Sequence, residues 1–273
     1  RKGVFEKLGM TCSFTDLDRA RAAGLSNGYR FLFRRPVPAE GLPFFDSFLP
    51  SMTMASCSAD LAAFFSTILA RRGPSAMRSE SFGDREDEAE LDGYRGSYGY
   101  GFLKTRFAGE RAYFFQGGYR SFRSYAFLFP EKKIGVLGLM NVNTMFSDAG
   151  LRELVPNLAR LELGLPVEKP GPDFSYGALL AVLVSAAALQ LGRMVRCLRR
   201  RSPGGFAWLA IALDICVVVL LLWVVPRLLS IQLNTMLFIQ PDLAWLMCGV
   251  AALSGVMVIL RFSALLVVYL RPR

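Results

Sequence analysis

The chain contains no histidine among its 273 residues, and its five cysteines are not clustered. Zinc sites in proteins are built mostly from histidine and cysteine side chains at short spacings. The sequence therefore predicts no metal site, and no motif in it calls for a cofactor. Cys12 and Cys57 could pair in principle, although their spacing does not require a disulfide.

Charged residues are also missing from long stretches of the last hundred residues. Residues 174–192 carry no charge, and this length is about what a helix needs to cross the hydrocarbon core of a bilayer. Residues 206–225 and 243–260 are two further apolar segments of similar length. The piece at 228–239 is too short to cross and suits an interfacial or re-entrant position. We therefore predict three membrane spans within residues 174–273.

Two charged residues interrupt or extend these apolar segments. Asp214 lies inside the second span, and an acid inside a membrane is by default a candidate functional residue. It stands alone in its segment, so helix packing near the cytoplasmic side is as good an interpretation as transport. The third span could continue through Leu270, in which case Arg261 would snorkel to the interface.

Arginines predict the orientation of the spans. The loop between the first two spans holds five arginines and no acid, whereas the next loop holds only Arg227 and Asp242. The five are Arg193, Arg196, Arg199, Arg200 and Arg201. Loops rich in lysine and arginine stay in the cytoplasm. We therefore expect a multi-pass protein of the inner (cell) membrane, with residues 1–170 outside and the C-terminus in the cytoplasm.

The net charge of +10 belongs mostly to the membrane region. Residues 174–273 hold 9 basic and 2 acidic residues, and the preceding part of the chain holds 23 and 20. The excess of arginine is explained by topology and predicts no nucleic-acid partner. The cluster at 199–201 could alternatively bind anionic lipid head groups of the bilayer.

Three short runs before the membrane region read as consecutive antiparallel strands. They cover residues 111–116, 121–129 and 134–140, and a proline-containing turn joins the last two. Gly117 and Gly118 lie between the first two runs. Two glycines at a strand end usually mean that another backbone or a ligand comes close, because a Cβ there would clash.

Two amphipathic segments flank these strands in the sequence. Residues 56–71 carry apolar residues at helical spacing, with Ser58 as candidate N-cap and Asp60 in the first turn, where the helix dipole favours an acid. Residues 151–163 have the same periodicity and are predicted to pack on the sheet. Residues 169–173 form a short, stiff linker. The sequence thus predicts an α/β (α+β) fold with an antiparallel sheet flanked by helices.

Several segments stand in an order typical of one enzyme superfamily. Residues 5–11 read FEKLGMT, residues 25–29 read LSNGY and residues 54–64 read MASCSADLAAF. The glycine pair, a Phe-Pro-Glu turn and a strand ending at Asn141 follow. Together they resemble the serine β-lactamase-like hydrolases: class C β-lactamases, D-alanyl-D-alanine carboxypeptidases and related esterases. The resemblance implies the C-terminal half of a β-lactamase/transpeptidase-like domain over residues 1–168.

The catalytic serine of that superfamily is missing from this sequence. There the nucleophile is the serine of a Ser-x-x-Lys motif, and a tyrosine or serine of a second motif assists proton transfer. No serine here is followed three residues later by lysine, and no tyrosine two residues later by asparagine. We therefore expect a fragment that begins after the nucleophile, is inactive alone, and contains no catalytic residue. Residues 1–170 on their own should be poorly soluble, because an open sheet would expose an edge and an apolar face.

One motif of the superfamily remains, at residues 116–119, and it implies a substrate-binding site. Its first position is usually lysine or histidine but here is Gln116, which can hydrogen-bond a substrate but carries no charge. By resemblance, Gly117 and Gly118 let the substrate lie along the strand. Tyr119 would give a backbone N–H to the oxyanion hole, which stabilises charge on the attacked carbonyl.

Three functions are compatible with these patterns. The first is a membrane-anchored, β-lactamase-related serine hydrolase of the cell envelope, acting through an acyl-serine on peptide, lactam or ester substrates. The second is a non-catalytic, membrane-tethered relative that binds or senses peptide-like ligands, which Gln116 favours slightly. In the third, the spans carry the function through Asp214, with the exported domain as an accessory. We rank them in this order.

Overall fold

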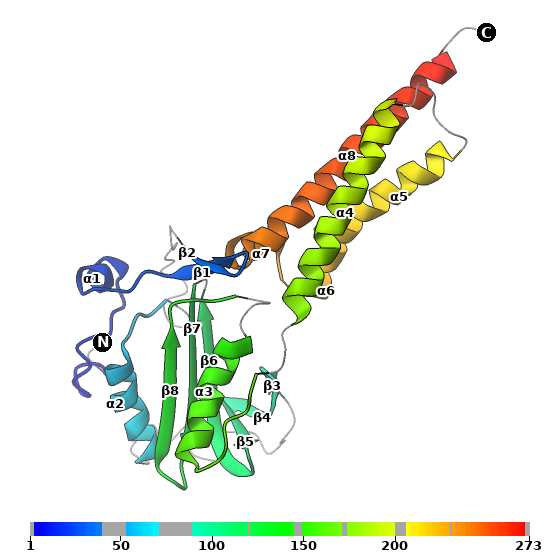
Figure 1. The fold of residues 1–273 in the computed structure, drawn as a ribbon. Helices are drawn as coiled ribbons and strands as arrows, with labels where there is room; N and C mark the ends of the chain where they lie inside the picture. Colours follow the sequence, from blue (N-terminus) through cyan, green and yellow to red (C-terminus); the bar gives the residue numbers. More distant parts are fainter. Residues whose placement is uncertain are drawn as a thin grey trace. The chain divides into compact units, whose positions relative to one another are not determined.

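The structure, a computed structural model, is divided into two units (Figure 1). The first unit comprises residues 1–30, 36–144 and 148–172, and the second comprises residues 31–35, 145–147 and 173–273. The residues that the structure describes are 3–39, 53–70, 89–119, 121–144, 149–170, 174–199, 206–229 and 231–270.

A six-stranded antiparallel sheet forms the centre of the first unit, and its strands follow one another in space as they do in sequence. They are β3 (Ala89–Leu91), β4 (Tyr94–Gly99), β5 (Phe102–Phe107), β6 (Glu110–Tyr119), β7 (Phe122–Phe129) and β8 (Ile134–Met140). The turns at 92–93, 100–101 and 108–109 each pair a residue at positive φ with a glycine at positive φ. Such two-residue turns match the right-handed twist of the strands that they join, which explains why the sheet is a simple meander.

The strand predictions hold in type and differ at the ends. Residues 134–140 form β8 as predicted, and β7 begins one residue later than expected. The prediction that Gly117 and Gly118 terminate a strand is wrong, because β6 continues to Tyr119. It continues because the ladder with β7 runs unbroken from Tyr113 to Tyr119. Glycine has a low strand propensity, but pairing with β7 gives the backbone of these two glycines its hydrogen bonds and keeps them in the strand.

Helices cover the two faces of this sheet, which confirms the predicted fold class (Figure 1). α3 (Ala149–Glu162) packs on one face, where its Val155 and Ala159 join a core that includes Phe127. α2 (Ser58–Leu69) packs on the other face against Ala126 and Leu128. The division follows from the strand period of two, which sends neighbouring β7 side chains to opposite faces.

The predicted N-cap of α2 is wrong. Cys57 occupies the N-cap position, and no side chain there makes a capping hydrogen bond. Ser58 is the first helical residue instead. The carboxylate of Asp60, in the first turn, accepts the backbone N–H of Cys12 at 2.8 Å. The rest of the unit contains α1 (Leu17–Ala22), and a two-stranded sheet pairs β1 (Tyr29–Leu32) with β2 (Arg35–Pro38).

The second unit is helical. It consists of α4 (Phe174–Arg199), α5 (Ala207–Val219), the π-helical turn η4 (Leu220–Val224), α6 (Val225–Leu228), α7 (Leu233–Ile239) and α8 (Pro241–Leu270). α8 packs along both α4 and α5 (Figure 1). The π-helical turn precedes Pro226, where a helix must accommodate a residue without an N–H.

Three of these helical segments are long and apolar enough to cross a membrane: Ser175–Arg199, Ala207–Leu228 and Pro241–Leu270. The first two predicted spans, 174–192 and 206–225, each begin one residue before one of these segments, and the third lies inside Pro241–Leu270. α8 runs to Leu270, as the longer alternative for the third span requires. The first loop is shorter than expected, because α4 continues through Arg193 to Arg199. Arginine ends an apolar stretch but is a good helix former, so the helix extends beyond the apolar stretch.

Candidate functional site

Gln116, Gly117 and Gly118 lie near the end of β6, in register with three residues of β7. Gln116 is opposite Tyr125, Gly117 opposite Ser124, and Gly118 opposite Arg123. The other neighbour of β6 is β5, and its ladder with β6 ends at the pair Leu103–Phe114. Among the residues that the structure describes, no strand therefore pairs with the second edge of β6 at residues 116–118.

The two glycines meet different surroundings. A Cβ on Gly117 would lie 2.5 Å from Ser124 Oγ and 3.3 Å from the ring of Phe115, so packing requires a glycine there. The nearest atom to a Cβ on Gly118 would be Nδ2 of Asn143, at 3.9 Å. The space above Gly118 is therefore open. The predicted close approach is made at Gly117 by a side chain, whereas Gly118 leaves room for a ligand.

The LSNGY segment at residues 25–29 lies against this end of the sheet. The backbone N–H of Tyr29 donates to the carbonyl of Asn141 at 2.7 Å, and Asn141 Nδ2 donates to the carbonyl of Asn27 at 2.9 Å. A Cβ on Gly28 would lie 2.6 Å from Cβ of Ser121, so this turn packs tightly at the start of β7. Three stretches that are far apart in the sequence thus meet beside residues 116–118.

A positive charge lies on the same face of the hairpin as Gln116. The guanidinium of Arg123 sits over the ring of Tyr125, 5.6 Å from its centroid. Since Tyr125 is the direct partner of Gln116, the guanidinium lies close to the position where the superfamily carries lysine or histidine. Sequence reasoning missed Arg123 as well as Ser124 and Asn143. The signal that could have found the first two was the hairpin register, which pairs them with the glycines.

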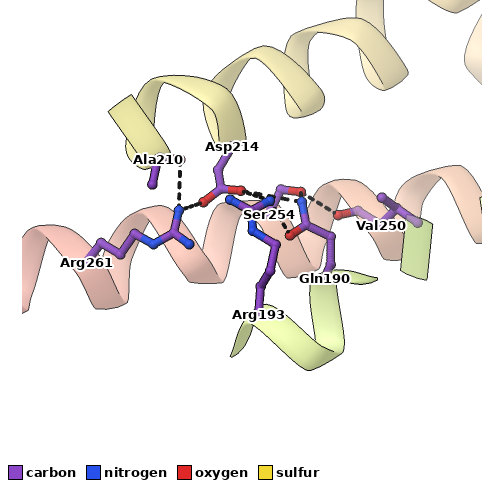
Figure 2. Close-up of polar contacts among 7 residues, drawn as sticks. All are labelled: Gln190, Arg193, Ala210, Asp214, Val250, Ser254 and Arg261. Atoms are coloured by element: carbon purple, nitrogen blue, oxygen red, sulfur yellow. Dashed lines mark hydrogen bonds and ion pairs between the residues drawn. The ribbon is translucent and has the colours of Figure 1, made fainter. Parts of the chain in front are cut away.

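A second cluster of polar side chains lies in the helical unit, around Asp214 (Figure 2). The carboxylate is fully buried, yet it faces two arginines. Arg193 Nη1 of α4 lies 2.9 Å from Oδ1, and Arg261 Nη1 of α8 contacts Oδ2. The same Nη1 of Arg261 donates to the carbonyl of Ala210 at 2.8 Å.

This arrangement corrects two predictions. Asp214 does not stand alone, and Arg261 does not snorkel to an interface but points at Asp214. The reason is electrostatic, because an unpaired buried charge costs far more than one that is paired and hydrogen-bonded. The single acid on α5 therefore draws in basic side chains from both neighbouring helices.

Uncharged groups complete the cluster (Figure 2). Gln190 Nε2 donates to Ser254 Oγ at 2.7 Å, and its Oε1 accepts from Arg193 at 2.9 Å. Ser254 Oγ in turn donates to the carbonyl of Val250 at 3.0 Å. The network joins α4, α5 and α8, which favours the helix-packing interpretation of Asp214 over the transport interpretation.

Comparisons with known proteins identify the first unit. The beta-lactamase family model matches residues 1–160. Among solved structures, the chain is similar to an octameric penicillin-binding protein homologue from Pyrococcus abyssi, with 24% identity and a TM-score of 0.47. That similarity covers 66% of this chain and 40% of the neighbour's chain, so this chain spans less than half of its neighbour's length. A comparison with curated proteins found no match.

Proposed function

The chain belongs to the beta-lactamase family, and from this premise we propose that it is the ligand-binding part of a membrane-anchored serine hydrolase. The substrates would be peptide-like, lactam or ester small molecules, and no cofactor is needed. The Ser-x-x-Lys motif that the reaction requires is absent from residues 1–273. We place that motif outside this sequence and expect residues 1–273 alone to be inactive.

The observation that carries this proposal is the open edge of β6 at residues 116–118. An extended, peptide-like ligand can add to such an edge through main-chain hydrogen bonds. The empty space above Gly118 would admit the ligand backbone, since the nearest atom to a Cβ there would be 3.9 Å away. Gln116 would hydrogen-bond the ligand through its side-chain amide.

The reaction would follow the acyl-serine route. A serine Oγ attacks the substrate carbonyl, the tetrahedral intermediate expels the amine or alcohol, and water then releases the acyl group. Charge develops on the carbonyl oxygen, and the backbone N–H of Tyr119 is our candidate donor to it. Donors aimed at this oxygen typically lower the barrier by about 3–4 kcal/mol.

Arg123 is our candidate for the charge that Gln116 lacks. Its guanidinium lies over Tyr125, the partner of Gln116 in the ladder. Arginine binds carboxylates in a bidentate way, so Arg123 would select ligands that carry an acidic group. We expect Arg123→Gln to weaken binding of an acidic ligand, with Arg123→Lys retaining part of the affinity.

The helical unit would anchor this site at the membrane. The three long apolar helices support a multi-pass region over 174–273, joined by a linker at 169–173 to a hydrolase-like domain over 1–168. The arginine-rich end of α4 supports a cytoplasmic location for that end, with the site on the outer side of the inner membrane.

A non-catalytic binding or sensing role is the second candidate. The observation that favours it is Gln116, because an uncharged amide at this position can hold a ligand but cannot supply the positive charge that the superfamily uses. In this case the ligand would bind at the same β6 edge and would leave unchanged.

An acylating probe separates the two candidates. The complete native polypeptide, in its membrane, is incubated with a fluorescent β-lactam and then denatured. A serine hydrolase keeps the label covalently. Gly118→Val fills the space above β6 and is expected to lower labelling about tenfold, equivalent to about 1.4 kcal/mol. Gly150→Val, where a Cβ would meet no atom within 4 Å, is the matched control.

The outcomes are distinct. Labelling that Gly118→Val leaves unchanged would contradict binding at the β6 edge. Reversible binding that depends on Gly118, without covalent label, would favour the non-catalytic candidate. If the probe neither binds nor labels the protein, both candidate functions are contradicted.

A further inference from the structure

Two cysteines of the first unit lie two residues from an isolated antiparallel bridge, on the same side of it. Phe14 and Ala55 exchange both backbone hydrogen bonds, at 2.8 and 3.0 Å. Counting two residues outward along each segment brings Cys12 opposite Cys57. Directly opposed residues in an antiparallel pair have Cα atoms about 4.5–5.5 Å apart. This spacing lies within the range of about 4.4–6.8 Å that a disulfide requires.

Side chains next to the cysteines fix this register. Ser13 Oγ and Ser56 Oγ, which lie between the bridge and the cysteines, are 2.8 Å apart. The buried carboxylate of Asp60 accepts from both Ser13 Oγ and the backbone N–H of Cys12, each at 2.8 Å. The segment of Cys12 is therefore held against the start of α2 on the cysteine side of the bridge.

The proton affinity of Cys12 agrees with this register. The neighbouring Cys57 side chain, through hydrogen bonding, followed by burial, raises the pKa of Cys12 to about 11. Both cysteines are half-buried, so a small oxidant or a redox protein can reach them. In the described part of the chain, no group of three or more acidic or cysteine side chains could hold a metal ion, so metal binding does not explain the pair.

We propose that Cys12 and Cys57 form a disulfide in the native protein. The inference rests on the exported location of residues 1–170 given under the proposed function, because disulfides persist in oxidising compartments. The oxidant is a protein or small-molecule disulfide of that compartment. One cysteine thiolate attacks the S–S bond of the oxidant, which breaks to give a mixed disulfide and a first carrier thiol. The second cysteine then displaces the other carrier sulfur, so the carrier ends as a dithiol, or as two thiols for a small molecule, and holds the two protons and two electrons.

The bond would act on the candidate site. It closes the loop from 12 to 57, which contains the turn at 25–29 that packs beside Ser121 and Asn141. Fixing the two ends of this loop limits its freedom in the unfolded and partly opened chain. Reduction is therefore expected to loosen the wall of the ligand site and to weaken binding at the β6 edge.

Peptide mapping of the complete native polypeptide tests the proposal. Membranes are quenched in acid, free thiols are alkylated, and the digest is compared with and without a reducing agent. The expected result is a linked peptide pair that contains Cys12 and Cys57 and disappears on reduction. Cys12→Ser should free Cys57 for alkylation, and Cys197→Ser, in α4, should leave the linked pair unchanged.

A second measurement separates the geometry from the compartment. The detergent-solubilised polypeptide is reduced and then equilibrated in a glutathione redox buffer. If Cys12 and Cys57 still do not link, the proposed geometry is overturned. If they link in the buffer but are found reduced in cells, the native disulfide is overturned together with the exported location. Covalent labelling by the β-lactam probe would stand in either case.

Discussion

Different kinds of buried side chains hold the two units together. In the first unit, large aromatic side chains fill the space between the sheet and α3, and Phe114 and Phe127 are completely buried. In the second unit, the polar cluster around Asp214 joins helices whose other faces are apolar and exposed. In water, burial of apolar surface drives folding. Between helices in lipid, apolar surface gives no such preference, and hydrogen bonds and close packing specify which helices pair.

The largest effect is expected in the aromatic core of the first unit. Phe127 is fully buried and packs against the rings of Phe107 and Phe114, whose centroids lie 4.7 and 4.8 Å away. Phe127→Ala should lower the free energy of unfolding of this unit by about 4 kcal/mol. Denaturant unfolding of the full chain in detergent measures it. Tyr98→Ala, at a 57% exposed position of the same sheet, is the control and should change little.

The helical unit should respond to loss of charge, where the first unit responds to loss of volume. Asp214→Asn keeps the size of the side chain but leaves Arg193 and Arg261 without their carboxylate. Because removal of one partner leaves buried charge uncompensated, we expect the free energy of unfolding of the helical unit to fall by about 3 kcal/mol.

An apolar replacement of the whole ion cluster is the informative control for Asp214. Changing Asp214, Arg193 and Arg261 together to leucine removes all three charges and should restore most of the stability that Asp214→Asn loses. Thermal aggregation in detergent compares the variants. If Asp214→Asn is as stable as the native chain, the network does not hold the helices together.

A smaller effect tests the packing of α3 on the sheet. A Cβ on Gly138 would lie 2.2 Å from Val155 Cγ2, so Gly138→Ala should cost about 2 kcal/mol through overpacking. Combining it with Val155→Ala makes room for the added methyl. The double variant should therefore be more stable than the sum of the two single changes predicts, and strict additivity would contradict the contact.

The sequence predicted the first unit better than the second because its signals are local. The apolar runs predicted β7 and β8 to within one residue, since such a run and the turn residues that bound it lie next to each other in the chain. The extension of β6 through Gly118 escaped prediction, because it depends on pairing with β7. Arg123 was missed for the same reason, since its place beside Gln116 appears only once the hairpin register is known.

In the second unit, apolar length predicted the helices but not their polar contacts. Asp214 and Arg261 are 47 positions apart in the sequence. Their contact depends on how α5 and α8 pack, which a run of apolar residues does not specify. The apolar pattern therefore predicts Arg261 at an interface and Asp214 without a partner, whereas the structure pairs the two. The ligand-site predictions at Gln116, Gly117, Gly118 and Tyr119 stay predictions until a ligand is tested.

The smallest effect concerns the hydroxyl of the half-buried Tyr94, at the edge of the aromatic core. Burial, with the negative charge of Glu153 adding to it, raises the pKa of Tyr94 to about 12. A tyrosine in the unfolded chain loses its proton near pH 10. The folded state thus holds the proton more tightly, so the stabilisation is complete below pH 10 and is lost as the pH rises towards 12. Because Tyr94 is partly solvent-screened, we expect this loss to be about 1 kcal/mol. Unfolding measured at pH 9 and pH 11 should show a smaller decrease for Tyr94→Phe, and an equal decrease in both proteins would assign the pH dependence to other groups.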